Sequence, residues 1–133
     1  MNDYIYIKNE KDALYFIEQC NGLHDGYITS FQYQNDGIVS EGDCTNFDFT
    51  KSKLTMQVLV TSHIDQITVE MVFEGILEWQ ICYGSSDIFG CIFEISKNSI
   101  TWTDSHTTDW KIMNECSFVK AISCAWRIIE NTK

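Results

Sequence analysis

The feature that most constrains the fold is a strict alternation of apolar and polar residues in two neighbouring segments. From Lys53 to Ser62, every even position from 54 to 60 is apolar, and after a short turn every odd position from 67 to 73 is apolar. A period of two places every second side chain on the same face of a β-strand. The two segments therefore predict an antiparallel hairpin with one buried face and one face in water.

Alternation resumes beyond Gly75, and this glycine predicts a bulge or a bend in the second strand. The resumed pattern places Trp79 on the inward side of the sheet. Two further short strands are expected, from Ile88 to Ile95 and from Ser99 to Thr103, on either side of a turn-forming pair of residues.

The segment from Phe118 to Ile129 fits a strand and a helix nearly equally by spacing. Phe, Val, Ile, Cys and Trp dominate it, and because these residues favour strands we expect a strand with Trp126 in the core. Helical spacing is clear only near the N-terminus. There Asp12 is expected to cap a helix of about ten residues and Asn21-Gly22 to end it.

These elements predict a mainly β fold of the α+β class. One short N-terminal helix would be followed by an antiparallel meander of about seven or eight strands, curled or two-layered, because a flat sheet of that width leaves an apolar face in water. A length of 133 residues favours a single domain over 1–133, since two separate cores would each be too small. Without an apolar run of membrane-spanning length or a signal-peptide pattern, the chain is expected to be cytoplasmic.

The chain is strongly acidic, with 19 Asp and Glu against 9 Lys and Arg and a formal net charge of -10. No Lys or Arg lies between Lys11 and Lys51, or between Lys53 and Lys97. Nucleic acid and anionic membranes are not expected as partners, because both are bound by clustered basic residues. The acidity has two interpretations: a solvated surface that keeps the protein soluble, and a surface that binds a basic partner.

A row of acids on the predicted wet face of the hairpin is the candidate for such a surface. Glu70, Glu74 and Glu78 are spaced by four residues, so on a continuous strand they lie on one side. The same row would also serve as an ordinary solvated face that protects the sheet against edge pairing.

Aromatic residues near this row are candidate anchors for a partner. Trp102 and Trp110, with Tyr83, would serve if they are exposed, because interface hot spots favour Trp and Tyr. The predicted partner-binding residues are thus the three glutamates together with Trp102 and Trp110.

Each of the three histidines lies near an aspartate, and His24 is followed directly by Asp25. A histidine with a carboxylate can perform acid–base chemistry or bind a ligand, although aspartate is also common at turns for backbone reasons. His24 and Asp25 are therefore a candidate ligand site, and no catalytic residue is assigned.

No motif assigns a metal or a cofactor. The oxygen-rich stretch from Glu41 to Asp48 departs from the order of a calcium-binding loop. The six cysteines form no Cys-x-x-Cys pair, and we expect Cys82, Cys91 and Cys124 to be small apolar fillers of strands.

The stretch Leu23-His24-Asp25-Gly26-Tyr27-Ile28, the 55–73 hairpin, Phe73-Glu74-Gly75-Ile76 and the final strand from Lys120 to Ile129 resemble a group of small bacterial proteins. In this group a hydrophobic-His-Asp segment opens a mostly β domain. Some members are assigned as immunity proteins of polymorphic toxin systems. The resemblance implies a cytosolic inhibitor without enzymatic activity, and Leu23 departs from it by standing where phenylalanine is more usual.

Two main hypotheses follow. The first is a non-enzymatic protein-binding module, similar to an immunity protein or antitoxin, whose acidic surface binds a basic, toxin-like partner. The alternative is a small-molecule or metal-binding domain, with or without catalysis, that uses His24 and Asp25 in a cleft. A homo-oligomer paired through sheet edges is a third hypothesis.

Overall fold

The computed structural model describes residues 3–63, 65–82, 88–113 and 115–131, and the described part is mainly β. No helix in it is both long enough and apolar enough to cross a membrane. The elements in chain order are β1 (Ile5–Tyr6), α1 (Glu10–Gln19), the 3-10 turn η1 (Asn21–Leu23), β2 (Gly26–Asn35), β3 (Ile38–Glu41), β4 (Cys44–Phe47), the 3-10 turn η2 (Phe49–Lys51), β5 (Ser52–Val60), β6 (Ile67–Gln80), β7 (Ile92–Ile95), β8 (Ile100–Thr103), α2 (Trp110–Met113) and β9 (Phe118–Asn131).

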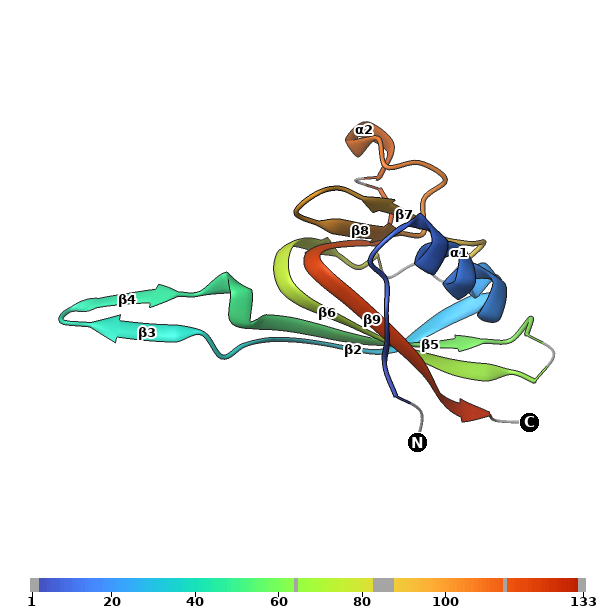
Figure 1. The fold of residues 1–133 in the computed structure, drawn as a ribbon, viewed down its shortest axis with the longest axis horizontal. Coiled ribbons are helices and arrows are strands. Elements are labelled where there is room, and N and C mark those ends of the chain that lie inside the picture. Colours follow the sequence, from blue (N-terminus) through green and yellow to red (C-terminus); the bar gives the residue numbers. More distant parts are fainter. Residues whose placement is uncertain (1–2, 64, 83–87, 114, 132–133) are drawn as a thin grey trace.

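The main sheet is antiparallel and has seven strands in the described residues, six of them in the order β2-β5-β6-β9-β8-β7, with β1 paired to β9. The predicted antiparallel β fold with a short N-terminal helix is confirmed, but the simple meander is wrong. The last strand, β9, inserts between β6 and β8, because its residues are apolar on both faces and fit the centre of a sheet. The sheet is not closed, and β2 and β7 are its edges (Figure 1).

The predicted hairpin is β5 with β6, paired from Val60 opposite Ile67 to Lys53 opposite Glu74. Strand β5 alternates between buried and partly exposed residues, as its pattern predicts. Strand β6 does not, because every residue from Ile67 to Phe73 is buried. The expectation that this strand has one face in water is therefore wrong over its first half.

The predicted bend in β6 is present at Gly75, which has a φ of +71°. A Cβ atom there would lie 2.7 Å from the Ile122 side chain, so the close approach of β9 also requires glycine. The pairing register then shifts between Ile76 and Glu78. Beyond this bulge Trp79 pairs with the buried Val119, but its side chain is 40% exposed rather than buried as predicted. Figure 1 shows β6 and β9 curving together at this point.

Helix α1 lies against the concave side of the sheet (Figure 1). Asn9, not Asp12, is its N-cap, and the Asn9 side chain accepts the Asp12 backbone N–H at 2.9 Å. Phe16 is fully buried and packs edge-on against Phe93 and Trp126, with ring centroids 5.3 and 5.2 Å away. The prediction of Trp126 as a core residue is confirmed.

The C-terminal half agrees with the predicted strands in kind and differs in one boundary. The segment 118–131 is a strand, which decides between the two interpretations of its spacing. The first strand of the β7–β8 hairpin begins at Ile92 rather than Ile88, because Ile88 instead forms an isolated bridge with Gly26.

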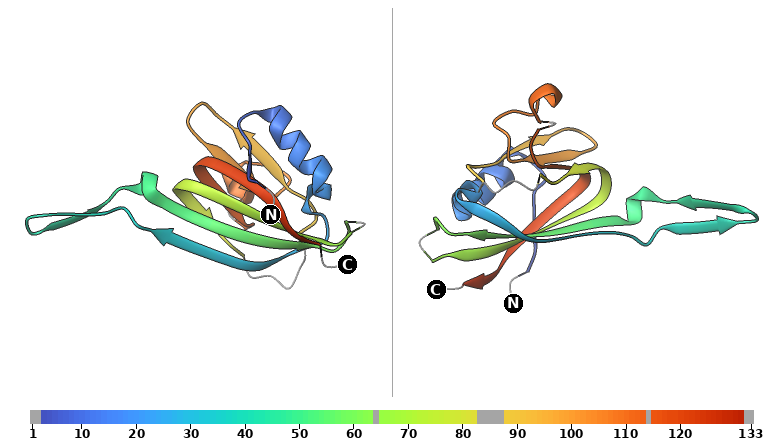
Figure 2. Two further views of the ribbon diagram at one scale, coloured as in Figure 1. Left: turned by 60° about the horizontal axis from the view of Figure 1, so that its bottom comes forward. Right: turned by 180° about the vertical axis from the view of Figure 1, so that it is seen from behind.

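Strands β3 and β4 form a separate two-stranded sheet that projects from the body as an arm. We call residues 36–49 the arm. The views in Figure 2 show it extending beyond the end of the main sheet, clear of α1 and of the β7–β8 hairpin.

Candidate partner-binding surface

The predicted acidic row does not form an open acidic surface. Glu70 is only 8% exposed and lies between strands and the N-terminal segment. Its carboxylate accepts the Tyr4 hydroxyl at 2.5 Å and Arg127 Nε at 3.0 Å, and a second Arg127 nitrogen lies 2.9 Å away. Gln57 donates to the other carboxylate oxygen at 3.2 Å.

The electrostatics of Glu70 fit a structural role. Burial acts to raise the pKa of Glu70, but hydrogen bonds from Tyr4, Gln57 and Arg127, with the charge of the guanidinium, outweigh it and lower this pKa. The Tyr4 ring also covers the Arg127 guanidinium, whose carbon lies 4.3 Å from the ring centroid. Glu70 thus fastens the N-terminal segment onto β6 and β9.

Glu74 and Glu78 are exposed, but each stands opposite a lysine in the sheet. Glu74 pairs in register with Lys53 of β5, and Glu78 pairs with Lys120 of β9. Directly opposed side chains in an antiparallel pair are near neighbours, so each acid of the row has a cation beside it. Because Glu70 is buried and paired, the prediction of an acidic docking strip is wrong for Glu70, whereas Glu74 and Glu78 remain exposed.

Among the predicted aromatic anchors, the structure describes the side chain of Trp102. Trp102 is fully buried, so it belongs to the core and cannot contact a partner. The side chain of Trp110 and all of Tyr83 lie outside the described residues. The aromatic residue exposed near the bend is instead Trp79, which the sequence pattern placed inside.

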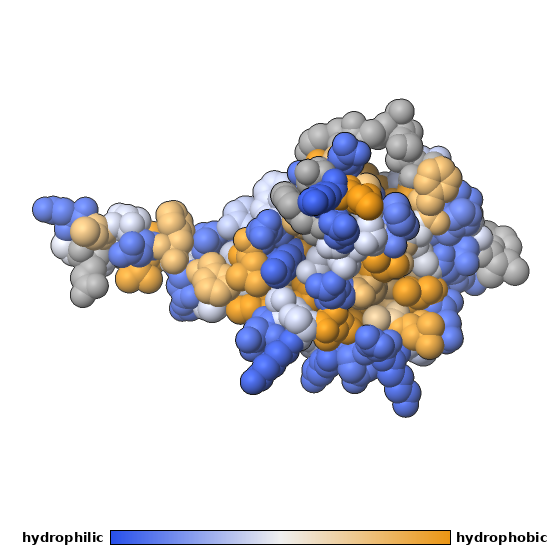
Figure 3. Space-filling view, turned by 90° about the horizontal axis from the view of Figure 1, so that it is seen from above, coloured by the Kyte–Doolittle hydropathy of each residue, from blue (hydrophilic) through white to orange (hydrophobic). Residues whose placement is uncertain are grey.

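The arm carries large exposed apolar side chains, which are of the kind expected beside the acidic row. Ile38 and Phe47 face each other across the β3–β4 ladder and are 61% and 62% exposed, and Val39 is 50% exposed. Figure 3 shows apolar side chains on the arm and again where it joins the body. A two-stranded hairpin is at most marginally stable alone, and these side chains leave apolar surface of the arm in contact with water.

The arm itself contains acids and no Lys or Arg, although the charge of Lys51, just beyond it, acts on Asp48. It lies within the stretch from Asp12 to Thr50, which contains no Lys or Arg. Asp36, at the base of the arm, and Asp43, at its tip, are exposed. Asp48 also lies at the base. The arm therefore combines apolar side chains with net negative charge.

A fixed joint sets the direction of the arm. At Gly37 a Cβ atom would lie 2.3 Å from the Asp48 carbonyl oxygen, so the two chains cross where only glycine fits. The Asp48 N–H donates to the Gly37 carbonyl at 2.7 Å. The Asp48 carboxylate caps the next turn by accepting the Thr50 N–H at 3.1 Å and the Thr50 hydroxyl, and these bonds lower the pKa of Asp48.

An aromatic patch lies at the root of the arm, formed by Phe31 and Tyr33 of β2 with Trp79 of β6. The Trp79 ring centroid is 5.0 Å from that of Phe31 and 5.8 Å from that of Tyr33. Tyr33 and Trp79 are 42% and 40% exposed. Aromatic rings held by one another in this way present contact area at little entropic cost.

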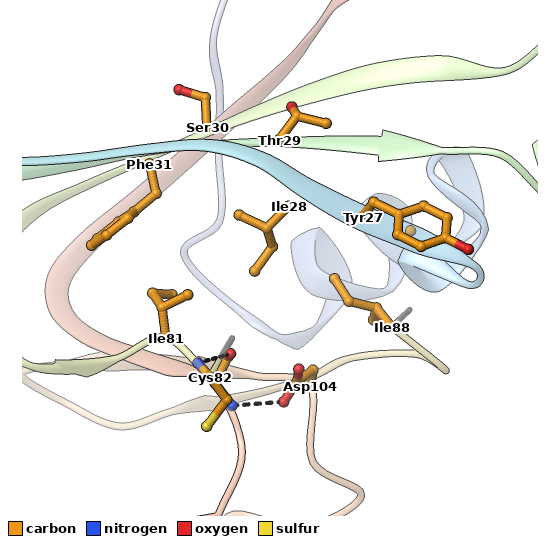
Figure 4. Close-up of a pocket in the computed structure, with 11 residues that line it drawn as sticks. Tyr27, Ile28, Thr29, Ser30, Phe31, Ile81, Cys82, Ile88 and Asp104 are labelled. Atoms are coloured by element: carbon orange, nitrogen blue, oxygen red, sulfur yellow. Dashed lines mark hydrogen bonds between the residues drawn. The ribbon is translucent and has the colours of Figure 1, made fainter. Parts of the chain in front are cut away.

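A cavity of about 230 Å³ lies beside this patch, under the first half of β2. Figure 4 shows Ile28 and Phe31 pointing into it from β2, with Ile81, Ile88 and Asp104 on the opposite side. The cavity and the aromatic patch share Phe31, so the two features form one continuous surface along β2.

His24 and Asp25, the predicted ligand site, do not line this cavity. The His24 Nδ1–H donates to the Phe89 carbonyl at 2.7 Å, and its Nε2 lies 3.7 Å from the Asp25 carboxylate. The Asp25 N–H donates to the Ile88 carbonyl at 2.7 Å, and the Asp25 carbonyl accepts the Thr61 hydroxyl at 2.9 Å. Their contacts tie three chain segments together at the start of β2.

The backbone of this segment is unusual. Asn21, Leu23 and Asp25 all have a positive φ, at 52°, 59° and 56°. Leu23 is also fully buried, and a left-handed conformation is rare for a branched apolar residue. The segment that carries the family resemblance is therefore a compact joint, held by the hydrogen bonds of Asp25.

The remaining titratable candidates form no cluster in the described part of the chain, where no group of three His, Cys, Asp or Glu is placed to hold a metal ion. Cys91 and Cys124 are buried as predicted, whereas Cys82 is exposed and the prediction for it is wrong. Burial raises the pKa of the Cys91 thiol to about 12, which makes it inert as a nucleophile at neutral pH.

Comparisons of the chain with protein-family models, with curated proteins and with solved structures found no match.

Proposed function

We propose that this protein is a non-enzymatic protein-binding module whose arm and aromatic patch bind a basic protein, in the manner of an immunity protein that captures a toxin. The observation that carries the proposal is the arm itself. It exposes Ile38, Val39 and Phe47 on an element outside the core, in a stretch of chain with acids and no Lys or Arg.

The charge of the arm favours a cationic partner over a second copy of the chain. Two copies would each have a formal net charge of -10 and would bring like-charged arms together, which opposes association. A basic partner would be drawn toward the arm over a distance and would then bury the apolar side chains.

The two contributions can be separated by paired variants. Asp36→Asn with Asp43→Asn removes charge from the arm, and Glu10→Gln with Glu18→Gln on α1 is the matched control, since all four side chains are exposed. The partner is captured from a host extract on the immobilised full chain, identified by mass spectrometry, purified and measured by calorimetry and surface plasmon resonance.

We expect a basic partner whose association rate falls at least ~10-fold in the arm variant and at high salt, with little change in the α1 control. Ile38→Ser with Phe47→Ser is expected to weaken affinity by about 2–4 kcal/mol, because two apolar side chains lose their burial at the interface. Leu14→Ser is the control for this pair, since Leu14 is a 56% exposed apolar residue on α1. A partner that is acidic, or one whose binding is unchanged by both arm variants, would refute the proposal.

A further inference from the structure

The cavity beneath β2 is lined by both apolar and polar residues, and one of its described lining residues is acidic. Ile28, Phe31, Ile81 and Ile88 line it together with Gly26, and Asp104 is its acidic residue (Figure 4). At about 230 Å³ it is smaller than the roughly 300–1,000 Å³ that drug-sized ligands occupy, and it suits a single side chain.

Asp104 is held in place by its backbone and by Ser117. One carboxylate oxygen of Asp104 accepts the Ser117 N–H at 2.9 Å, and the Asp104 N–H donates to the Ser117 carbonyl at 3.2 Å. The fully buried Thr103 hydroxyl donates to the same carbonyl at 2.9 Å. These bonds fix the direction of the carboxylate, which cannot turn toward solvent without breaking them.

Among the described residues, no Lys, Arg or His nitrogen lies within 4.0 Å of the Asp104 carboxylate, in contrast to Glu70 with its Arg127. Burial raises the pKa of Asp104, and hydrogen bonds from backbone N–H groups offset only part of this effect. A partly buried carboxylate with no cation beside it costs stability, and an arriving cation would remove that cost.

We propose that this cavity binds one Lys or Arg side chain of the basic partner, with the methylene stem against Ile28, Phe31 and Ile88 and the cationic group on Asp104. The inference rests on the proposed function and adds to it the place where one basic side chain of the partner is anchored. Long basic side chains bury their stems on apolar surface while their charge finds a polar group, which is the arrangement this cavity offers. Its continuity with the aromatic patch through Phe31 would let the same partner contact both.

The test uses small probes on the full chain labelled with ¹⁵N. N-acetyl-lysine methylamide and N-acetyl-arginine methylamide carry the two cations, and N-acetyl-norleucine methylamide and N-acetyl-citrulline methylamide are their neutral counterparts. We expect at least one cationic probe to shift the backbone signals of residues 26–31 and of Ser117 in a saturable way at millimolar concentrations. The neutral probes are expected to bind at least ~10-fold more weakly. Equal shifts with neutral and cationic probes, or no saturable shift with either cation, would overturn the inference.

Asp104→Asn removes the charge and keeps an oxygen that can accept the Ser117 N–H. We expect it to weaken the cationic probe at least ~10-fold, while Glu18→Gln, an exposed position on α1, leaves probe binding unchanged. If Asp104→Asn disturbs the spectrum, Ile81→Phe is a second variant that fills the cavity from its other wall and is expected to exclude the probe.

The outcomes separate the two proposals. If both cavity variants still bind the probe, the cavity inference is overturned. Partner binding by the arm then still has its own test. If a partner binds through the arm and has the same affinity for Asp104→Asn as for the wild type, only the proposal that the cavity anchors a basic side chain is refuted.

Discussion

The acidic row makes a sharp prediction, because its three members lie in different environments. Glu70→Gln is expected to destabilise the protein by about 2–3 kcal/mol. Glutamine keeps an acceptor for the Tyr4 hydroxyl but removes the negative charge that faces the Arg127 guanidinium. Breaking a fully buried ion pair costs roughly 3–5 kcal/mol, and the exposed fractions of the two side chains, 19% for Arg127 and 10% for Glu70, place this pair below that range.

The assay is urea denaturation followed by tryptophan fluorescence, with thermal unfolding as a second measure. A loss of 2–3 kcal/mol corresponds to a decrease in Tm of roughly 8 °C for a chain of this size. Glu74→Gln and Glu78→Gln are the controls from the same row, and because their side chains are exposed we expect each to change stability by less than ~0.5 kcal/mol. Equal effects at all three positions would refute the distinction between a structural Glu70 and a solvated pair.

The same pair gives a pH dependence with a defined sign. The pKa of Glu70 in the folded protein lies below its ordinary value of 4.5, so its ionised form is favoured by folding. Its contribution is complete above that ordinary value and is lost as pH falls through the lowered pKa of the folded state. Unfolding free energies of the wild type and of Glu70→Gln should therefore differ at pH 7 and converge in acid, below the lowered pKa of Glu70. A difference that persists unchanged into this acid range would contradict the assignment.

Two further changes test the joint of the arm and the core. Gly37→Ala places a Cβ atom 2.3 Å from the Asp48 carbonyl oxygen, and we expect faster hydrogen exchange of the Asp48 amide and lower stability. At the tip, Gly42→Ala meets no neighbouring atom within 4 Å, so only its positive φ opposes the change and a loss of about 1 kcal/mol is expected. Phe16→Ala should cost about 3–5 kcal/mol in urea unfolding because it opens a cavity beside the rings of Phe93 and Trp126, whereas Leu14→Ala on the same helix should cost less than ~0.5 kcal/mol. Similar losses for the two helix variants, or an unperturbed Asp48 amide, would contradict the packing described.

Local patterns predicted the elements whose environment is set within one strand. The hairpin of β5 with β6 was predictable because each even residue of β5 is buried and its neighbours are not. The glycine bend was predictable at Gly75, but the bulge just beyond it was not, since nothing in the sequence shows where a register shift falls.

Long-range contacts account for the errors at the candidate site. Glu70 is covered by Tyr4, 66 residues earlier in the chain, and paired with Arg127, 57 residues later. Neither contact can be recognised from the local alternation of apolar and polar residues, which predicted that this face of the strand lies in water. The absence of basic residues from 12 to 50 was visible in the sequence, but its position on a projecting hairpin depends on the joint of Gly37 with Asp48.

The position of β9 has a consequence for how the protein is made. Residues 118–131 leave the ribosome after all the other strands, yet they form the strand between β6 and β8 and also hold β1. Until they emerge, the β5–β6 and β7–β8 hairpins have no common neighbour, and the nascent chain exposes unpaired edges on both. Assembly of the sheet therefore waits for β9 and is dominated by contacts distant in sequence, which makes folding slow relative to helical proteins of this length.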